Sequence, residues 1–308
     1  IYVINNLVIF NFLSIEINNL IRSEGNSKLA MNSMIIGAFI NIVFDPILIF
    51  YFDMGIKGAA YATIFSNIIV SLINLHYFTL SKNSHIKLRV KDLILDLETV
   101  KKILSIGISP FSLQLTTSLT SVLCNKMLLS QGGDLAVGAM GIVNSIYLFL
   151  GMTMSGISSG SQPILGYNYG AKKHGRVLET LKVSIIAAVG VGSIITITTL
   201  LFPNFFINLF NDGNQEILRI GSRGIRIYFL LIPLNCFYII GTNFFQYINN
   251  AMKSVVLNLL RQVLLFIPLL FILPKYFGID GVWMVFLTSD VIIFIITRYF
   301  LKKHVKNV

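Results

Sequence analysis

Long apolar runs alternate with polar connectors along the whole chain. Windows of about 20 mostly apolar residues can cross the ~30 Å hydrocarbon core of a bilayer as a helix. Nine such windows occur, at 2–21, 33–52, 58–79, 104–129, 135–160, 180–203, 224–245, 254–273 and 279–301. Because lipid offers no partner to an unpaired backbone N–H or C=O group, each window is expected to be α-helical. The pattern therefore predicts an all-α, polytopic transmembrane helical bundle.

The polar connectors differ in charge. Basic residues, Arg261 among them, gather in every second connector and near the C-terminus, over 22–28, 82–102, 172–182, 253–261 and 298–306. The positive-inside rule places these connectors in the cytoplasm, so the C-terminus is expected to be cytoplasmic and Ile1 to lie outside. A trio of arginines departs from the rule, and its spacing puts all three on one helix face. The trio consists of Arg219, Arg223 and Arg226. These residues either cap the outer end of the seventh window or face lipid headgroups.

A polar segment at 81–102 separates two groups of windows. Its apolar positions have the spacing of an amphipathic helix that lies on the cytoplasmic membrane surface. These positions are Val90, Leu93, Ile94, Leu97 and Val100. We interpret the segment as a linker between an N-terminal lobe of three helices, residues 1–80, and a C-terminal lobe of six helices, residues 103–308.

An internal repeat supports two pseudo-symmetric lobes. The sequence GIKG at 55–58 precedes the third window, and GIDG at 278–281 precedes the ninth, 223 residues later. Such internal repeats are common in transporters. If equivalent positions are 223 residues apart, the helix that starts near residue 104 has its equivalent about 120 residues before residue 1. The chain also opens within an apolar run, without a Met. The N-terminal lobe is therefore expected to lack its first three helices, and this chain is not expected to transport by itself.

Composition agrees with a membrane chain and narrows the classes of function. Of 308 residues, 55% are apolar and 12% are charged, against about 25% charged in an ordinary soluble domain. The net charge of +11 fits basic cytoplasmic connectors better than a nucleic-acid surface, because no basic stripe interleaved with aromatics lies outside the windows. No metal-ligand spacing, CxxC pair or catalytic cluster occurs, so no enzyme activity or resident cofactor is expected. The scattered residues concerned are Cys124, Cys236, His76, His85, His174 and His304.

Three acids lie well inside the windows: Glu16, Asp45 and Asp290. A carboxylate near mid-membrane costs at least ~2.5–3.5 kcal/mol, so it usually faces a polar interior and has a function. Asn41 lies one turn before Asp45, and Pro46 after it leaves a carbonyl oxygen without its helical partner. These hard oxygen ligands suit a proton or Na⁺; the alternative is that Asp45 only pins two helices together. Glu16 either lines a central cavity that attracts cations or bonds across helices, and Asp290 is interpreted as structural.

Several stretches resemble the MATE (multidrug and toxic compound extrusion) family, in the family's order. Residues 36–38, 41–46 and 54–63 look like its fifth and sixth helices, and 19–26 look like the turn after its fourth helix. Residues 132–134 and 136–141 look like the stretch that leads into its eighth helix, and 162–171 look like the motif that follows it. The family has twelve helices in two pseudo-symmetric bundles and exports drugs in exchange for H⁺ or Na⁺. The resemblance implies that Asn41, Asp45 and Thr63 bind the coupling cation, while the family's helix-one acid has no counterpart here. Windows 104–129 and 224–245 contain no acid, so a C-terminal cation site is not expected.

A further motif of this resemblance follows the fifth window. It reads as a helix stop and then a Gly- and Asn-rich turn with interfacial tyrosines, which favours a pivot or gate support over substrate contact. Its residues are Gln162, Pro163, Gly166, Tyr167 and Gly170.

The expected function is multidrug efflux, in which amphipathic and often cationic drugs and dyes are exported by alternating access coupled to H⁺ or Na⁺. The protein is expected as a monomer in the cell membrane, the inner membrane of a bacterium. One rival is a flippase of the same MOP superfamily for lipid-linked oligosaccharide or polysaccharide; its cavity would be cationic, whereas the intramembrane charge here is acidic. An inactive transporter fragment is a second alternative. A membrane-embedded enzyme would need a clustered set of polar side chains at a membrane face, and a structural protein would not need a carboxylate, an amide and a proline together in mid-span.

Overall fold

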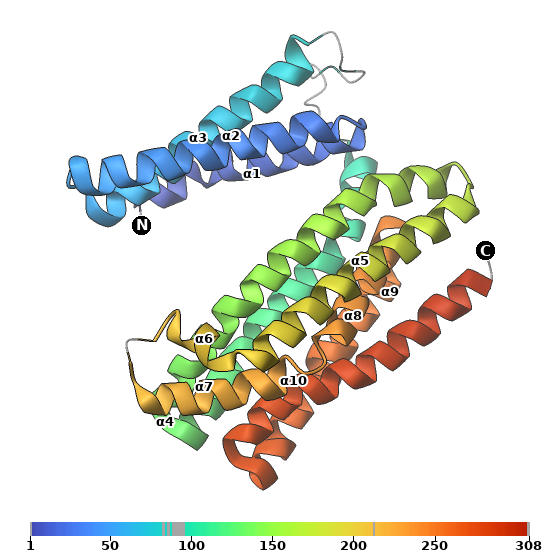
Figure 1. Ribbon diagram of the computed structural model, residues 1–308. Coiled ribbons are helices and arrows are strands. Elements are labelled where there is room, and N and C mark those ends of the chain that lie inside the picture. Colours follow the sequence, from blue (N-terminus) through green and yellow to red (C-terminus); the bar gives the residue numbers. More distant parts are fainter. Residues whose placement is uncertain (1, 82–83, 85–86, 88–95, 212, 307–308) are drawn as a thin grey trace. The chain divides into compact units, whose positions relative to one another are not determined.

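The computed structural model describes residues 2–81, 84, 87, 96–211 and 213–306 (Figure 1). Every regular element in this described part is helical. The elements are α1 (Tyr2–Ser23), α2 (Ser27–Pro46), η1 (Ile47–Tyr51), α3 (Gly55–Thr79), α4 (Leu97–Gly170), α5 (His174–Leu201), α6 (Pro203–Asn208), α7 (Gln215–Tyr228), α8 (Ile232–Tyr247), α9 (Ala251–Leu259), η3 (Leu260–Phe266) and α10 (Ile267–Lys306). The elements η1 and η3 are short π-helical stretches, which carry one more residue per turn than an α-helix.

Five helical segments of the described chain are long and apolar enough to cross a membrane: Ser27–Tyr51, Gly55–Thr79, Leu97–Gly170, His174–Leu201 and Ala251–Val305. Helices α7 and α8 together pass the same test as one span bent by 55°. The first window is helical as α1 but is not among the five. The chain is therefore polytopic, as the hydrophobic pattern predicts.

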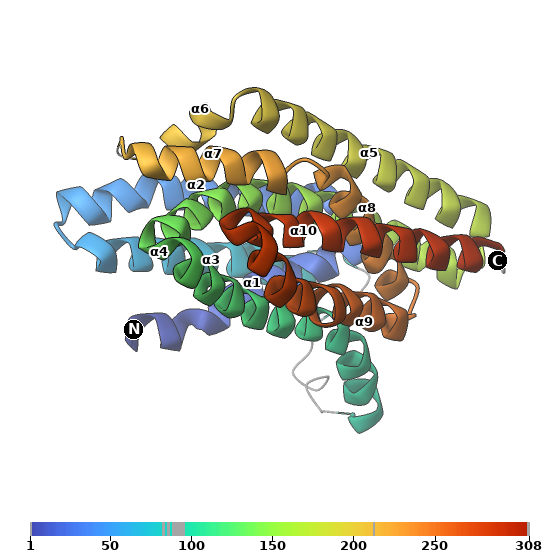
Figure 2. The ribbon, with the colours of Figure 1, turned by 90° about the horizontal axis from the view of Figure 1, so that it is seen from below.

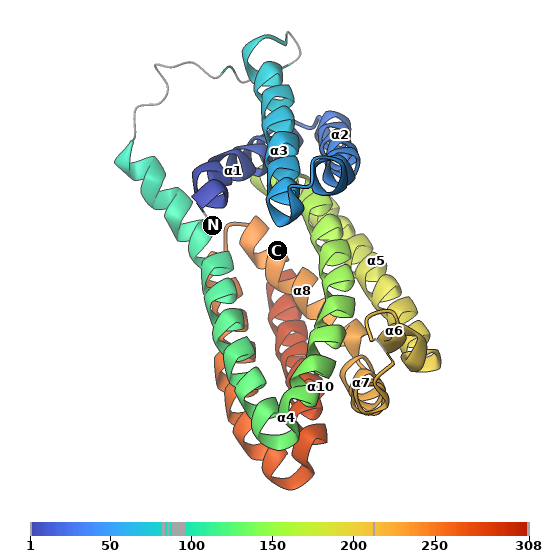
Figure 3. The ribbon, with the colours of Figure 1, turned by 90° about the vertical axis from the view of Figure 1, so that its left-hand side faces the viewer.

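Two of these segments reverse direction at a glycine and contain two helical stretches each. The backbone of Gly133 has φ 66° within α4, and that of Gly278 has φ 57° within α10. Figure 3 shows α4 turning back near its middle, and Figure 2 shows the same for α10. Left-handed φ values carry little cost for glycine because it has no Cβ. The windows 104–129 and 135–160, and likewise 254–273 and 279–301, are thus separate helical stretches.

The seventh window, 224–245, is not the single straight helix that its hydropathy predicts. The helix breaks between Tyr228 and Ile232, because a continuous helix would need a backbone N–H at Pro233 to reach the carbonyl of Phe229. The hydroxyl of Thr196 on α5 donates to that carbonyl instead, at 2.9 Å. A proline and a hydroxyl from a neighbouring helix therefore stabilise the bend.

The chain forms two compact units, residues 1–96 and 97–308. In the first unit α1, α2 and α3 pack together around Ile21 and Phe78. Asn18 joins α1 to α2 by donating to the backbone oxygen of Ala30 at 2.8 Å and to the hydroxyl of Ser33 at 3.0 Å. In the second unit, α4 to α10 enclose a larger core that contains Trp283. Most of the predicted 81–102 linker lies outside the described residues.

The two Gly-x-x-Gly turns of the repeat have the same backbone geometry. The first glycine is left-handed in both, with φ 53° at Gly55 and 57° at Gly278. The second glycine lies against the preceding helix, where an added Cβ would come within 2.6 Å of a carbonyl oxygen at Gly58 and within 2.5 Å at Gly281. The two halves of the repeat therefore form the same local structure, a tight turn followed by close packing of two backbone segments.

We expect Gly281→Ala to destabilise the second unit by about 1–3 kcal/mol, the usual cost of overpacking. The new Cβ would meet the backbone oxygen of Leu273 at 2.5 Å, and a backbone atom cannot move aside as a side chain can. Thermal unfolding can be followed by thiol labelling of Cys124 and Cys236, which are both free and buried. Gly107→Ala is the control, because its Cβ would meet no atom within 4 Å. Equal unfolding temperatures for the two variants would contradict this prediction.

Candidate functional site

Asn41, Asp45 and Thr63 come together in the first unit. The amide nitrogen of Asn41 lies 3.3 Å from Oδ1 of Asp45 and 3.5 Å from the Thr63 hydroxyl, and it donates to both. The Thr63 hydroxyl donates its own proton to the backbone oxygen of Ala59 at 3.0 Å. Asn41 and Asp45 are half-buried on α2, and Thr63 is an exposed residue of α3. A carboxylate, an amide and a hydroxyl therefore converge from two helices, within hydrogen-bonding reach.

Small residues and a proline position this cluster. Gly37 on α2 lies so close to α3 that a Cβ there would approach Val70 Cγ2 to 2.4 Å, so the two helices pack tightly. At the other end, α2 finishes at Pro46 and the chain continues as the π-helical η1. Pro46 has no N–H, and a π-helical turn also changes which carbonyls are engaged. Asp45 thus lies where the regular hydrogen-bond ladder of the helix is interrupted.

Glu16 is not part of this cluster. Its side chain is exposed on α1. Within the described residues, it makes no hydrogen bond with Asn41, Asp45 or Thr63. The cavity role and the cross-helix role of Glu16 both stay predictions.

The motif after the fifth window does not stop a helix. Helix α4 continues past Pro163 to Gly170, and the turn follows at Lys172, which has φ 55°. A proline removes one backbone hydrogen bond, and the buried Asn168 adds one by donating to the carbonyl of Ile164 at 2.8 Å. The exposed Gln162, Gly166, Tyr167 and Gly170, together with half-buried Pro163, thus belong to the last turns of α4. Their pivot or gate role stays a prediction.

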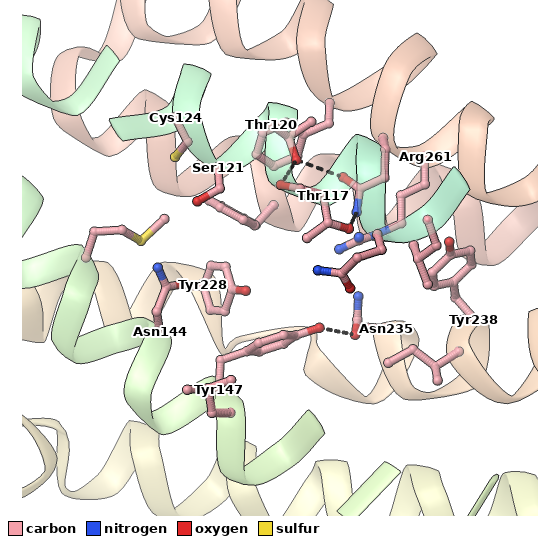
Figure 4. A pocket seen from close by; sticks show the side chains of 18 of the residues that line it. Thr117, Thr120, Ser121, Cys124, Asn144, Tyr147, Tyr228, Asn235, Tyr238 and Arg261 are labelled. Atoms are coloured by element: carbon pink, nitrogen blue, oxygen red, sulfur yellow. Dashed lines mark hydrogen bonds between the residues drawn. The ribbon is translucent and has the colours of Figure 1, made fainter. Parts of the chain in front are cut away.

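The second unit contains a cavity of about 520 Å³ that the sequence pattern does not predict. Figure 4 shows amides, hydroxyls, aromatic rings and one guanidinium arranged around it. Its lining comes from α4, α7, α8, η3 and α10, and no acid is among the described residues that line it. The polar lining residues are Gln114, Thr117, Thr120, Ser121, Asn125, Asn144, Tyr147, Tyr228, Asn235, Tyr238, Arg261 and Gln262.

Arg261 is paired with Asp290 at the side of this cavity. Its Nε donates to Oδ1 of Asp290 at 2.9 Å, and the side chains are 10% and 5% exposed. Asn235 donates to the same carboxylate oxygen at 3.0 Å and accepts from the Tyr147 hydroxyl at 3.1 Å. The Arg261 guanidinium also lies 5.3 Å from the centre of the Tyr238 ring. A buried charge needs such partners, because desolvation without them is very costly.

This pair corrects two expectations. Arg261 was grouped with the basic residues of a cytoplasmic connector. It lies instead inside the second unit, on η3. The charge inside the windows is therefore not only acidic. One signal was available in the sequence: Arg261 and Asp290 both lie within predicted windows, and ionisable residues inside membranes tend to pair. What the sequence does not supply is the contact between two residues on different helices.

The arginine trio lies on one face of α7, as its spacing predicts. Arg219, Arg223 and Arg226 are exposed, and the opposite face buries Gly221 and Ile225. Arg223 also forms an ion pair of 2.5 Å with Asp280, which belongs to the second Gly-x-x-Gly turn. The helix is therefore amphipathic, and the ion pair connects it to the turn within α10.

Apolar helices of spanning length, an internal repeat and polar sites within helical units define a multi-pass α-helical membrane protein. Residues 111–272, more than half of the chain, match the family described as MatE. The chain therefore belongs to the MATE family of transporters, as the sequence motifs indicate.

Known proteins of this family resemble the chain over most of its length. It is 28% identical over 263 residues to the multidrug export protein MepA of Staphylococcus aureus (strain MSSA476), a match that covers 85% of this chain and 57% of that protein. The crystal structure of a mutant MATE protein superposes with a TM-score of 0.91 at 22% identity, covering 99% of this chain and 68% of that one. An outward-facing MATE family transporter of the MOP superfamily gives 0.89 at 23% identity, covering 94% and 65%. The chain thus spans less than two thirds of the length of the curated relative.

Proposed function

We propose that this chain is part of a transporter that exports amphipathic small molecules, drugs and dyes among them, in exchange for H⁺ or Na⁺. The observation that carries the proposal is the convergence of Asn41, Asp45 and Thr63 in the first unit. Membership of the MATE family and similarity to a multidrug export protein support the same function. The protein would act as a monomer in the cell membrane, with a cytoplasmic C-terminus.

Asp45 would bind and release the coupling cation in this scheme. A proton would bind a carboxylate oxygen, and Na⁺ would bind oxygens of Asp45 and Thr63, with a third from Asn41 after a half-turn of its amide group. Either cation would neutralise a carboxylate that is costly to hold within the membrane. Coupling requires that cation and drug favour different conformations, since a ligand with equal affinity for both conformations shifts no equilibrium.

The test is dye efflux from vesicles that contain the protein expressed from its complete reading frame. A ΔpH or ΔpNa is imposed so that the cation flows into the vesicles while the dye leaves them. We expect one of these gradients to raise the efflux of a cationic dye at least several-fold. The gradient that succeeds identifies the coupling ion. Efflux that matches protein-free vesicles under both gradients would contradict the proposed function.

A flippase for lipid-linked saccharides is the second candidate, and Arg261 is the observation that favours it. A diphosphate-linked carrier has at least two negative charges, which call for several unpaired cations. In the described part of the cavity, however, Arg261 is the lone charged lining residue, and Asp290 already balances it. Amides and aromatic rings make up most of the remaining polar wall, which suits small amphipathic molecules better.

A further inference from the structure

Three arginines concentrate positive charge on one face of α7. Arg219, Arg223 and Arg226 are exposed and lie on the same side of the helix. Asp280 balances Arg223, at an N–O distance of 2.5 Å. Arg219 and Arg226 form no ion pair and no side-chain hydrogen bond with any residue that the structure describes. Two guanidinium groups, each with five N–H donors, therefore face the surroundings of the protein without a fixed partner.

Packing fixes the direction in which this arginine face points. On the opposite side of α7, a Cβ added to Gly224 would come within 2.6 Å of the ring of Trp283, which is fully buried on α10. The Ser222 hydroxyl donates to Oδ1 of Asn204 on α6 at 2.7 Å. Helix α7 is thus held against α10 and α6, and it cannot rotate to bury its arginines.

Exposed aromatic side chains flank the arginine face. Helix α6 lies beside α7 (Figure 2), and its Phe205 is exposed. Tyr276 and Phe277 are also exposed, and they come just before the turn that contains Asp280. Aromatic rings next to basic residues are typical of the interface between a membrane and water. This end of the second unit therefore has the composition of a surface that contacts lipid headgroups.

Hydrocarbon is an unsuitable environment for this face. An arginine inside a membrane is costly unless its side chain reaches the headgroup level. The 55° bend between α7 and α8 allows α7 to depart from the direction of the helix that follows it. At headgroup level the abundant anion is phosphate, whose oxygens match the parallel N–H donors of a guanidinium. Charge and geometry thus both favour a lipid phosphate as the partner of the two unpaired arginines.

We propose that the arginine face of α7 is a binding site for an anionic phospholipid, with Arg219 and Arg226 in contact with its phosphate and Phe205 beside its acyl chains. The lipid belongs to the leaflet opposite the cytoplasm, given the expected cytoplasmic C-terminus. Phosphatidylglycerol is favoured over phosphatidylcholine, because the choline group cancels the charge of the phosphate. The inference goes beyond the proposed export function and does not depend on it.

The test measures which lipid lies next to α7. A bimane fluorophore is attached at Gln215→Cys, which is exposed and one turn before Arg219, while Cys124 and Cys236 are buried. The purified protein is placed in phosphatidylcholine nanodiscs. These contain increasing fractions of a quenching lipid with a nitroxide near the top of one acyl chain, either phosphatidylglycerol or phosphatidylcholine. A basic residue near an anionic surface strengthens binding about fivefold, so half-maximal quenching should need roughly 25-fold less phosphatidylglycerol than phosphatidylcholine.

Three variants separate the arginine face from the rest of the surface. Arg219→Gln with Arg226→Gln should bring the two half-maximal fractions within about twofold of each other. Glu216→Gln removes an exposed carboxylate from the same side of α7, so it should lower the half-maximal fraction of phosphatidylglycerol about fivefold. Lys302→Gln with Lys303→Gln is the matched control, because it removes two exposed positive charges near the C-terminal end of α10. It should keep the wild-type preference.

Equal half-maximal fractions for the two lipids in the wild-type protein would overturn the inference, and this comparison applies even if a variant does not fold. A double arginine variant that keeps the preference, or a double lysine variant that loses it, would also overturn it. Inorganic phosphate tests a free anion as the occupant. If it abolished quenching by phosphatidylglycerol while sodium chloride of equal ionic strength did not, the site would belong to free phosphate and the proposal would be wrong. No gradient or drug is present, so this result and that of the export test are independent.

Discussion

Asp45→Asn is expected to reduce gradient-driven dye efflux to the level of protein-free vesicles. The amide preserves the shape of the side chain and its contact with Asn41, which lies 3.3 Å away, but it cannot take up a proton and binds Na⁺ weakly. Membrane insertion should not suffer, because the substitution removes a charge that is costly within the bilayer. Efflux is measured under the imposed ΔpH or ΔpNa that drives the unsubstituted protein.

Asp53→Asn is the control for this experiment. Asp53 lies eight positions further on, exposed between η1 and α3, and makes no ion pair with a described residue. It should transport like the wild type. If Asp45→Asn still moved dye against a gradient, Asp45 would be a structural residue and the proposed coupling mechanism would be wrong.

Asp290→Ala is expected to destabilise the protein by about 3–5 kcal/mol, the cost of leaving a buried charge without its partner. The substitution would leave the guanidinium of Arg261, which is 10% exposed, with no carboxylate. Unfolding is followed through the reactivity of the buried cysteines during heating. The double variant Arg261→Met with Asp290→Leu should recover most of this loss, because apolar side chains of similar size can replace a buried ion pair with little change in stability.

The exposed pair of Glu98 and Lys102, with an N–O distance of 2.7 Å, provides the comparison. Both side chains are more than two-thirds exposed, so Glu98→Ala should cost less than about 1 kcal/mol. A similar loss in Glu98→Ala and Asp290→Ala would show that burial does not set the strength of the Arg261–Asp290 contact.

The local sequence determined the helical, polytopic character of the chain. Hydrophobic runs of spanning length leave the backbone no alternative to a helix in lipid, so the class follows from composition and window length. The repeat was visible for a similar reason: Gly55 and Gly278 both need a left-handed backbone, and Gly58 and Gly281 both need the absence of a Cβ. Asn41 and Asp45 could also be paired from the sequence, since residues four apart share a helix face.

The position of Thr63 could be predicted only in part from the sequence. It lies 22 residues from Asn41, and the family resemblance implied a shared role of the two residues in binding the coupling cation. The close approach at Gly37 is a contact between two helices, so the tertiary structure was needed to place the two polar groups 3.5 Å apart. Their role in binding a cation stays a prediction.

Tertiary packing alone decided the features that the sequence pattern missed. Arg261 was counted as a connector residue because a charge count along the chain contains no information about Asp290 on another helix. The bend between α7 and α8 is stabilised by the Thr196 hydroxyl of α5 in addition to Pro233, and the contact with α5 is not visible in the local sequence. Spacing along the chain determines contacts within one or two helical turns, whereas contacts between distant helices depend on how their surfaces fit. The cavity of the second unit belongs to the latter kind, because its walls come from helices that are distant in sequence.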